Sequence, residues 1–163
     1  MKNLFIGFFF MICMSLSINA QNTLSDLSIE GIDGKKVNIK ELTSSKKLTI
    51  ISFWATWCKP CKQELNNIAE IYEEWQDNYD VQLLAISIDN ARTAYKVKTY
   101  VDGQDWDYVV LLDKNQELKQ SLNFQTVPYT LVINAEGEIV YRHQGYVEGD
   151  EYELEDKLKE LTK

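Results

Sequence analysis

The sequence predicts an α/β sandwich, in which a sheet with parallel strands and one antiparallel pair is flanked by helices. Three observations predict this class. Short apolar runs rich in β-branched residues alternate with stretches of helical period, a turn joins the last two strand candidates, and no linker rich in proline, glycine or serine divides residues 22–163. A chain of 163 residues with 45% hydrophobic content fits one such domain.

The first twenty residues are predicted to be a signal peptide rather than part of that domain. Lys2 precedes an apolar run from Leu4 to Ile18, and Ala20 is a small residue before polar Gln21. The run is short for a membrane-spanning helix, which needs about 20 apolar residues, so an uncleaved anchor is the alternative. We therefore expect an exported, periplasmic or otherwise extracytoplasmic protein whose domain covers residues 21–163.

The first elements of the domain are a hairpin and a buried strand. Residues 26–39 alternate around Gly31 and Asp33-Gly34, which is typical of a small β-hairpin, and a short helical turn is expected near residues 40–43. Residues 47–54 (KLTIISFW) form a near-continuous apolar run, which predicts a central strand covered on both faces.

The pattern then alternates between helix and strand to the end of the chain. Residues 58–78 have helical period, and VQLLAISID (81–89) predicts a second central strand. The further elements predicted are a helix over 91–101, a strand over 108–112, a short helix near 116–122, strands over 128–134 and 138–144 joined by a turn at 135–137, and a charged amphipathic helix from Asp150 onward.

The net charge argues against a nucleic-acid partner. The chain has 17 basic and 25 acidic residues, a formal charge of -8, and removal of residues 1–20 would leave 16 basic residues and a charge of -9. Phosphate binding needs a basic surface, and the acidic residues here are spread along the chain.

Cys58 and Cys61 are the two cysteines that remain after export, since Cys13 lies in the leader. A zinc site needs four ligands, and the chain offers one such pair and a single histidine, His143. Haem attachment needs a histidine directly after the second cysteine, where Lys62 stands. A structural staple over so short a loop would remove little entropy from the unfolded chain. A redox pair is therefore the favoured interpretation, with no metal.

The position of the pair at the start of a helix suits redox chemistry. Free N–H groups and the helix dipole favour a thiolate on Cys58, and Lys59 could add to that field. Pro60 lies where a missing N–H is tolerated and stiffens the turn. At about 100° per residue, Cys61 shares the apolar face of the helix with Leu65. Cys58 is thus the expected attacking sulfur, and Cys61 the shielded resolving one.

Glu64 lies about 60° from the centre of that apolar face. A carboxyl group there is expected to be partly desolvated with a raised pKa, and one turn after Cys61 it could exchange a proton with that thiol. The alternative is a glutamate that favours the helix dipole and bends toward solvent.

Pro128 opens the apolar strand PYTLVIN, and two interpretations are open from the residues alone. In one, the proline marks the start of a strand; in the other, the peptide bond after Val127 is cis.

Together, FWATWCKPC, TVPYT, the SIDN strand end, the AEGEIVYRHQGY hairpin and the element order resemble the thioredoxin superfamily, and in particular its TlpA/ResA-like exported thiol-disulfide oxidoreductases. The resemblance covers roughly residues 24–162. It implies a thioredoxin-like sandwich with an N-terminal β-hairpin extension. It also implies that Cys58 is the nucleophile, Cys61 the resolving cysteine, Pro128 a cis-proline facing the disulfide, and Glu64 a glutamate near the cysteines. Val127 would offer backbone groups to a substrate chain.

Further positions match or depart from the family. Trp57 is expected to flank the reactive sulfur and Trp54 to lie in the core, while Lys59 and Pro60 are expected to tune the redox potential. Ser52 stands where thioredoxins have a buried aspartate, which makes Glu64 the candidate substitute for it. Asn66 stands where relatives often have a kinking proline, which predicts a straighter helix after Cys61. No specific role is expected for His143.

The expected function is exchange of dithiol for disulfide with protein substrates, without a cofactor other than the Cys58–Cys61 disulfide. The resemblance favours a reductase, for example in cytochrome c maturation, supplied with electrons by a membrane thiol carrier, and we expect a monomer. Alternatives are a thiol oxidase or isomerase of exported proteins, and a thioredoxin-fold binding module or chaperone without redox turnover. A copper-delivery protein is a further alternative, although its close relatives space the cysteines more widely and add a histidine.

Overall fold

A computed structural model describes residues 23–163 of the chain. The predicted signal peptide over residues 1–20, with its alternative of an anchor, lies outside the described residues. Within residues 23–163, no helix combines the length and the apolar character needed to cross a membrane.

Seven strands and six helices follow one another along the described chain. In order they are β1 (Ser28–Gly31), β2 (Lys36–Asn38), α1 (Ile39–Thr43), β3 (Leu48–Trp54), α2 (Lys59–Ala69), α3 (Tyr72–Tyr79), β4 (Val81–Ser87), α4 (Tyr95–Val101), β5 (Val109–Leu112), α5 (Glu117–Ser121), β6 (Tyr129–Asn134), β7 (Ile139–Gln144) and α6 (Asp150–Leu161). The strands form one mixed sheet in the order β2-β1-β5-β4-β3-β6-β7.

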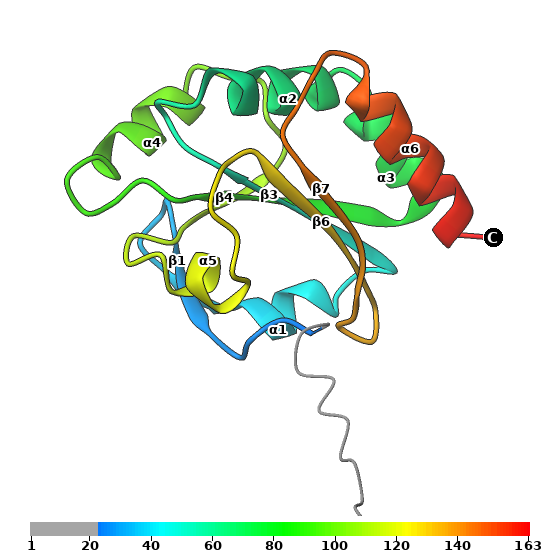
Figure 1. Ribbon diagram of the computed structural model, residues 1–163, viewed down its shortest axis with the longest axis horizontal. Coiled ribbons are helices and arrows are strands. Elements are labelled where there is room, and N and C mark those ends of the chain that lie inside the picture. The colour runs from blue at the N-terminus through cyan, green and yellow to red at the C-terminus, as the bar shows by residue number, and fades with distance from the viewer. Residues whose placement is uncertain (1–22) are drawn as a thin grey trace, which may run out of the picture.

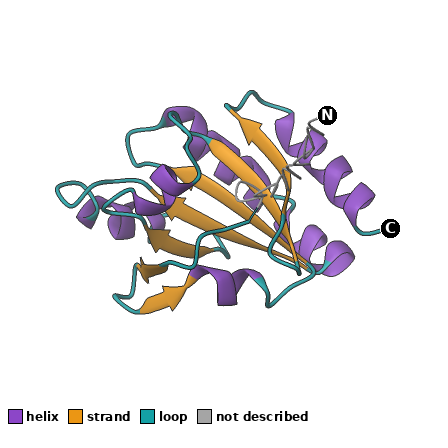
Figure 2. Ribbon diagram, turned by 60° about the horizontal axis from the view of Figure 1, so that its bottom comes forward, coloured by secondary structure: helices purple, strands orange, loops and turns teal. Residues whose placement is uncertain are grey.

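The predicted mixture of parallel and antiparallel strands is confirmed. Strand β4 runs parallel to both β3 and β5, whereas β6 runs antiparallel to β3 and β7. Figure 1 shows α2, α3, α4 and α6 above the sheet and α1 and α5 below it, and Figure 2 shows the twisted strands between them. Since both faces are covered, every residue of β3 is buried.

The predicted N-terminal hairpin is also present. Strands β1 and β2 pair antiparallel around a turn in which Gly34 has a φ of 82°, a conformation that favours glycine. Strand β1 then pairs antiparallel with β5, so the hairpin extends the sheet beyond its parallel part. Asn38 ends the hairpin and caps α1, because its side chain accepts hydrogen bonds from the N–H groups of Lys40 and Glu41.

The continuous helical stretch predicted over residues 58–78 is divided into two helices. Helix α2 ends at Ala69 and α3 begins at Tyr72. The Ile71 N–H donates to the carbonyl of Ile68, only three residues back, and this tighter turn interrupts the helical ladder. The Tyr72 hydroxyl accepts a hydrogen bond from the Leu83 N–H in β4 at 2.8 Å, which ties the start of α3 to the sheet.

The helix predicted over residues 91–101 is shorter than expected. Asn90 takes the chain into turns, accepting the N–H groups of Thr93 and Ala94 at its carbonyl and that of Arg92 at its side chain, and α4 begins only at Tyr95.

Candidate active site

The cysteine pair lies where a strand end meets a helix start. Strand β3 ends at Trp54, and Cys58 is the N-cap of α2. Cys58 and Cys61 form a disulfide with their Cα atoms 5.4 Å apart. The Cys61 N–H points at the Cys58 sulfur, 3.3 Å away. A thiolate formed at Cys58 would therefore receive this N–H and the positive end of the helix dipole.

The two cysteines differ in accessibility in the predicted order. Cys61 is fully buried, whereas Cys58 keeps 5% of its surface exposed. Trp57, directly before it, is 65% exposed, while Trp54 is completely buried, as expected. Lys59 and Pro60 are both exposed and occupy the first two positions of α2. A substrate can therefore approach Cys58 but has no direct path to Cys61.

Glu64 is buried, with only 4% of its surface exposed, on the inner face of α2. One carboxylate oxygen accepts the Thr130 hydroxyl at 2.7 Å, and the other accepts the Ser52 hydroxyl at 3.1 Å. Ser52 and Thr130 are partners across β3 and β6, so the sheet presents both hydroxyl groups together. Among residues 23–163, the hydrogen bonds of the Glu64 carboxylate come from these two side chains and from neither cysteine.

Burial raises the pKa of Glu64 from its ordinary 4.5 to about 7, against the opposing effect of the hydrogen bonds from Thr130 and Ser52. The predicted desolvation is therefore present, and the alternative of a side chain bent into solvent is wrong. A carboxyl group with this pKa can both take up and release a proton near neutral pH. Ser52, in place of a buried aspartate, donates a hydrogen bond to this carboxylate.

A small cavity of about 10 Å³ borders Glu64 on the side of β7 and α6. Thr130, His143 and Asp150 contribute to its lining, and the ring of His143 lies 3.2 Å from the Asp150 carboxylate. This is room for about one water molecule. His143, to which the sequence analysis assigns no role, is the cross-strand neighbour in β7 of Thr130, which bonds to Glu64.

The Val127–Pro128 peptide bond is cis, which decides between the two interpretations of the proline. Strand β6 starts at the next residue, and Tyr129 pairs with Phe53 near the end of β3. Pro128 thus lies at the same end of the strands at which β3 leads into the loop before Cys58. Within residues 23–163, the backbone of Val127 forms no hydrogen bond, whereas the Pro128 carbonyl accepts the Gly145 N–H.

Asp89 is a site residue that the sequence reasoning missed. It is completely buried just after β4, and its carboxylate accepts the Thr56 N–H at 2.7 Å and the Thr56 hydroxyl at 2.8 Å. These bonds hold the loop that leads from β3 to Cys58. An acidic residue directly after an apolar strand was the available signal.

The middle of α2 is held in place by residues that follow α4. The Trp106 indole donates to the side chain of Asn66, and the Tyr108 hydroxyl donates to the Leu65 carbonyl, both at 2.9 Å. Asn66 therefore helps to fix the position of the helix by a hydrogen bond. Nothing in the sequence pattern pointed to these partners.

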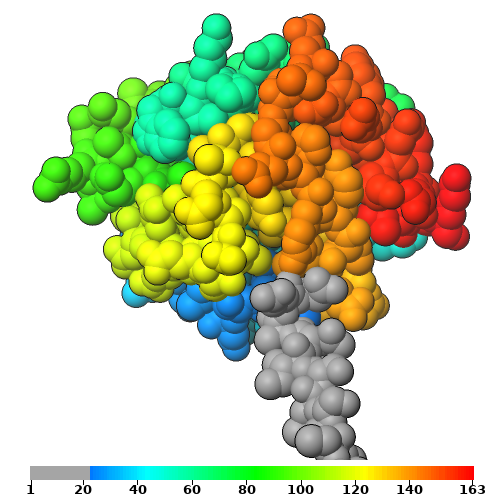
Figure 3. All heavy atoms as spheres, viewed as in Figure 1, coloured from blue at the N-terminus to red at the C-terminus, as the bar shows by residue number. Residues whose placement is uncertain are grey.

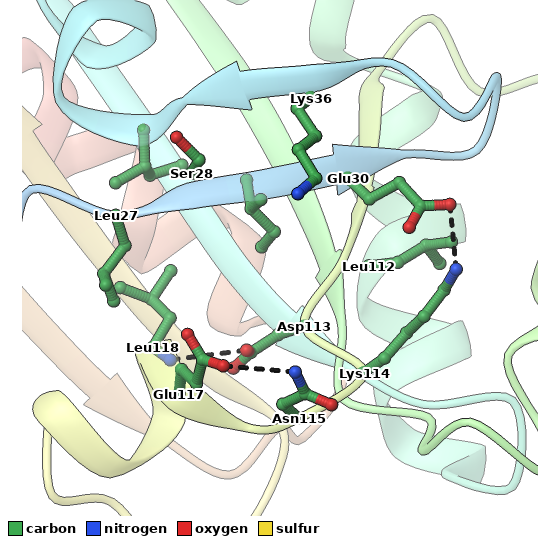
Figure 4. Close-up of a pocket in the computed structure, with 12 residues that line it drawn as sticks. Leu27, Ser28, Glu30, Lys36, Leu112, Asp113, Lys114, Asn115, Glu117 and Leu118 are labelled. Atoms are coloured by element: carbon green, nitrogen blue, oxygen red, sulfur yellow. Dashed lines mark hydrogen bonds and ion pairs between the residues drawn. The ribbon is translucent and has the colours of Figure 1, made fainter.

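A separate hollow of about 290 Å³ lies below the sheet, between the N-terminal hairpin, β5 and α5 (Figure 4). Its charged groups bond to one another: Lys114 pairs with Glu30 at 2.8 Å, and Asp113 accepts the N–H of Leu118 in α5. It contains no part of the thiol site. Within residues 23–163, no group of three or more His, Cys, Asp or Glu side chains could hold a metal ion.

Comparison with known proteins gives consistent matches over most of the chain. Residues 20–142 match the AhpC/TSA family. The "Thiol-disulfide oxidoreductase ResA" of Bacillus thuringiensis is 28% identical over 82% of this chain and 73% of its own length, and the "Thioredoxin-like protein YneN" of Bacillus subtilis is 30% identical over 82% and 75%. A solved thioredoxin-like protein from Porphyromonas gingivalis is 45% identical, with a TM-score of 0.76 over 88% of this chain and 92% of its own.

Proposed function

This chain belongs to the AhpC/TSA family and is a thiol-disulfide oxidoreductase with a thioredoxin-like fold, and from that premise we propose that it works outside the cytoplasm as a reductase of protein disulfides. The observation that carries the proposal is the Cys58–Cys61 pair at the N-terminus of α2, with the buried carboxyl group of Glu64 one turn farther along the helix.

The proposed reaction begins with the reduced protein. The Cys58 thiolate attacks one sulfur of the substrate disulfide, forming a mixed disulfide and releasing one substrate thiol, which takes up a proton. Cys61 then loses its proton and attacks the Cys58 sulfur, releasing the second substrate thiol. The substrate gains two electrons and two protons, and the protein is left with the disulfide seen in the structure.

Glu64 is proposed to accept the proton of Cys61 during the second step. Cys61 is fully buried, so bulk water has no direct access to its thiol. A carboxyl group with a pKa of about 7 is partly ionised at neutral pH and can take up that proton. Ser52 and Thr130 would hold the carboxylate in place through their hydroxyl groups.

The substrate chain is proposed to lie across Trp57 and the segment before β6. The free backbone N–H and C=O of Val127 could pair with an extended segment, and Pro128 would shape the surface beside the disulfide. The exposed indole of Trp57 offers an apolar contact next to Cys58. Lys59 and Pro60, between the two sulfurs, are proposed to tune the reduction potential.

The direction of electron flow and the partners are part of the proposal. Curated relatives include proteins named thiol-disulfide oxidoreductase ResA, which supports the exchange reaction, and we propose that this chain runs it as a reductase, with cytochrome c maturation as one setting. Protein disulfides would be the substrates, and a membrane thiol carrier would restore the dithiol. The protein would act as a monomer, exported with the help of residues 1–20.

Two cysteine variants test the exchange mechanism. Cys61→Ser should accumulate mixed disulfides with substrate at Cys58, because the resolving thiol is missing, whereas Cys58→Ser should abolish turnover. Trapping of substrate by non-reducing electrophoresis and mass spectrometry distinguishes the two. Full activity of Cys58→Ser would instead support a binding module or chaperone without redox turnover.

The reduction potential tests the direction. Equilibration of the Cys58–Cys61 pair against glutathione should give a value of about -250 mV or below for a reductase. A value near about -120 mV would mean that the protein works as an oxidase.

A further inference from the structure

We propose that the active-site face selects substrates with acidic side chains beside the reactive cysteine, and that it binds them against a basic active-site surface formed by Lys59, Lys62, Arg92 and Lys96. The inference rests on the proposed thiol-disulfide exchange and adds the chemical class of the substrate segment.

Positive charge is concentrated in the segments that flank the cysteines. Residues 56–63 and 90–101 together contain five of the 17 basic residues of the chain and none of its 25 acidic residues. The chain as a whole has a formal charge of -8. These two segments therefore differ in sign from the chain as a whole.

The fold brings these two segments together. The Ile88 N–H donates to the Trp54 carbonyl at 2.9 Å, and Asp89 holds Thr56, so the turns that lead to α4 lie beside the loop that leads to Cys58. The ammonium group of Lys62 lies 5.2 Å from the centre of the Tyr100 ring, which joins α2 to α4. Figure 3 shows the teal and green segments next to one another on the upper part of the molecule.

These four cations are not neutralised by carboxylates. Within residues 23–163, no ion pair engages any of the four, and Lys62 and Lys96 instead lie over tyrosine rings. Lys98, the fifth basic residue, is paired with Asp102 at 2.8 Å and is left out of the surface. The positive charge of this face is thus available to a partner.

Exposed aromatic side chains lie among the cations. Trp57 is 65% exposed and Tyr95 is 71% exposed, and each lies in one of the two segments that carry the cations. Large aromatic residues and arginine are enriched in protein-binding surfaces, so Trp57, Tyr95 and Arg92 favour a protein partner for this face.

The positive charge of the surface lies on one side of α2. On the other side of α2, Glu148 lies 3.5 Å from the side chain of Gln63, and the next exposed apolar residue there is Val147. An acidic residue of a bound segment would therefore lie toward α4, not toward α6.

A protein segment explains this surface better than an anionic membrane. Lys59 and Lys62 lie within four residues of Cys58 in the chain, and Cys58 is only 5% exposed, so a reacting disulfide must come close to the surface before its sulfur can be attacked. Attraction between acidic side chains of the substrate and the basic active-site surface would raise the rate of encounter and orient the substrate segment.

Three peptides of equal length, each closed by one disulfide, test the proposal. They differ only in the residues beside the cysteines, which are glutamate, glutamine or lysine. The reduced protein is mixed with each peptide in single-turnover experiments, and each rate is divided by the rate of the same peptide with dithiothreitol, which removes differences in intrinsic reactivity. The glutamate peptide should react about tenfold faster than the lysine peptide at low salt, and the difference should shrink as salt screens the charges.

A pair of variants separates local charge from net charge. Arg92→Gln combined with Lys96→Gln should bring the rate of the glutamate peptide toward that of the glutamine peptide. Lys36→Gln combined with Lys40→Gln makes the same change in net charge at exposed positions of β2 and α1, across the sheet from α2, and should keep the preference.

Several results would overturn the inference. Equal normalised rates for the three peptides would exclude charge selection while leaving the exchange reaction intact. Loss of the preference in the Lys36 and Lys40 control would show that net charge alone is responsible. Binding to phosphatidylglycerol vesicles together with equal peptide rates would assign the surface to a membrane. Failure of all three peptides to react would overturn the proposed function itself.

Discussion

Replacing Glu64 with glutamine tests whether ionisation of this buried carboxyl group lowers the free energy of unfolding. The carboxyl group is buried between α2 and the sheet, and its hydrogen bonds come from the hydroxyl groups of Ser52 and Thr130. Glutamine has the same shape and can keep both neighbours, because each hydroxyl can turn to donate or to accept. The substitution therefore removes the ionisation with little change in packing.

The size of the effect follows from the pKa of Glu64, which burial raises from 4.5 to about 7. A raised pKa means that the folded protein binds this proton more tightly than the unfolded chain does. The stability from this group is thus complete below pH 4.5 and is lost as the pH rises through 7. At about 1.4 kcal/mol per pKa unit, the loss amounts to about 3 kcal/mol, of which about 2.5 kcal/mol falls between pH 5 and pH 8.

The measurement is urea unfolding of the oxidised protein at these two pH values. The free energy of unfolding of Glu64→Gln, relative to the unsubstituted protein, should increase by about 2.5 kcal/mol from pH 5 to pH 8, because glutamine does not ionise. Glu70→Gln, at an exposed position at the end of the same helix, is the matched control and should show no such change.

Equal pH dependence of unfolding in the Glu64→Gln variant and the unsubstituted protein would refute this reasoning. It would mean that Glu64 titrates as it does in water, and the proposed transfer of a proton from Cys61 would lose its physical basis. If the carboxyl group does titrate near pH 7, the same substitution should also shift the thiol titration and slow the exchange reaction.

Further predictions concern the residues that support the site. Thr130→Val removes the 2.7 Å hydrogen bond to the carboxylate and should raise the pKa of Glu64 further, as measured by carboxyl-carbon NMR; an unchanged or lower pKa would contradict the role given to Thr130. Asp89→Ala leaves the Thr56 N–H without its partner and should lower the free energy of unfolding by about 2 to 3 kcal/mol, and it should also slow exchange at Cys58. Asp102→Ala, which breaks an exposed pair with Lys98, should cost less than about 1 kcal/mol in the same urea titration, and equal losses for the two substitutions would contradict the assignment of Asp89.

The sequence predicted those features that depend on local pattern. The order of strands and helices followed from apolar runs and helical period, and the helical wheel alone placed Glu64 among buried residues. The break between α2 and α3 escaped prediction because the apolar period continues through it. At the break the Ile71 N–H donates to Ile68, and just beyond it Tyr72 accepts the N–H of Leu83 in β4, a partner that local pattern does not reveal.

The partners of the site residues could not be predicted in the same way. Thr130 is 66 positions from Glu64 in the chain, and Asp89 is 33 positions from Thr56. Such pairs are set by strand order and register, which no local pattern encodes. The sequence could therefore place the cysteines and Glu64 on one helix, but not identify what holds that helix and the loop before it.

The contact between Glu64 and Thr130 also bears on the order in which the protein matures. A chain that has emerged only as far as α5 already contains Cys58 and Cys61, but β6 has not yet paired with β3. Until it does, Glu64 lacks the Thr130 hydroxyl, although Ser52 and the helix that holds the cysteines are already present in the chain. The buried setting of Glu64 is thus completed only with the last strands of the sheet.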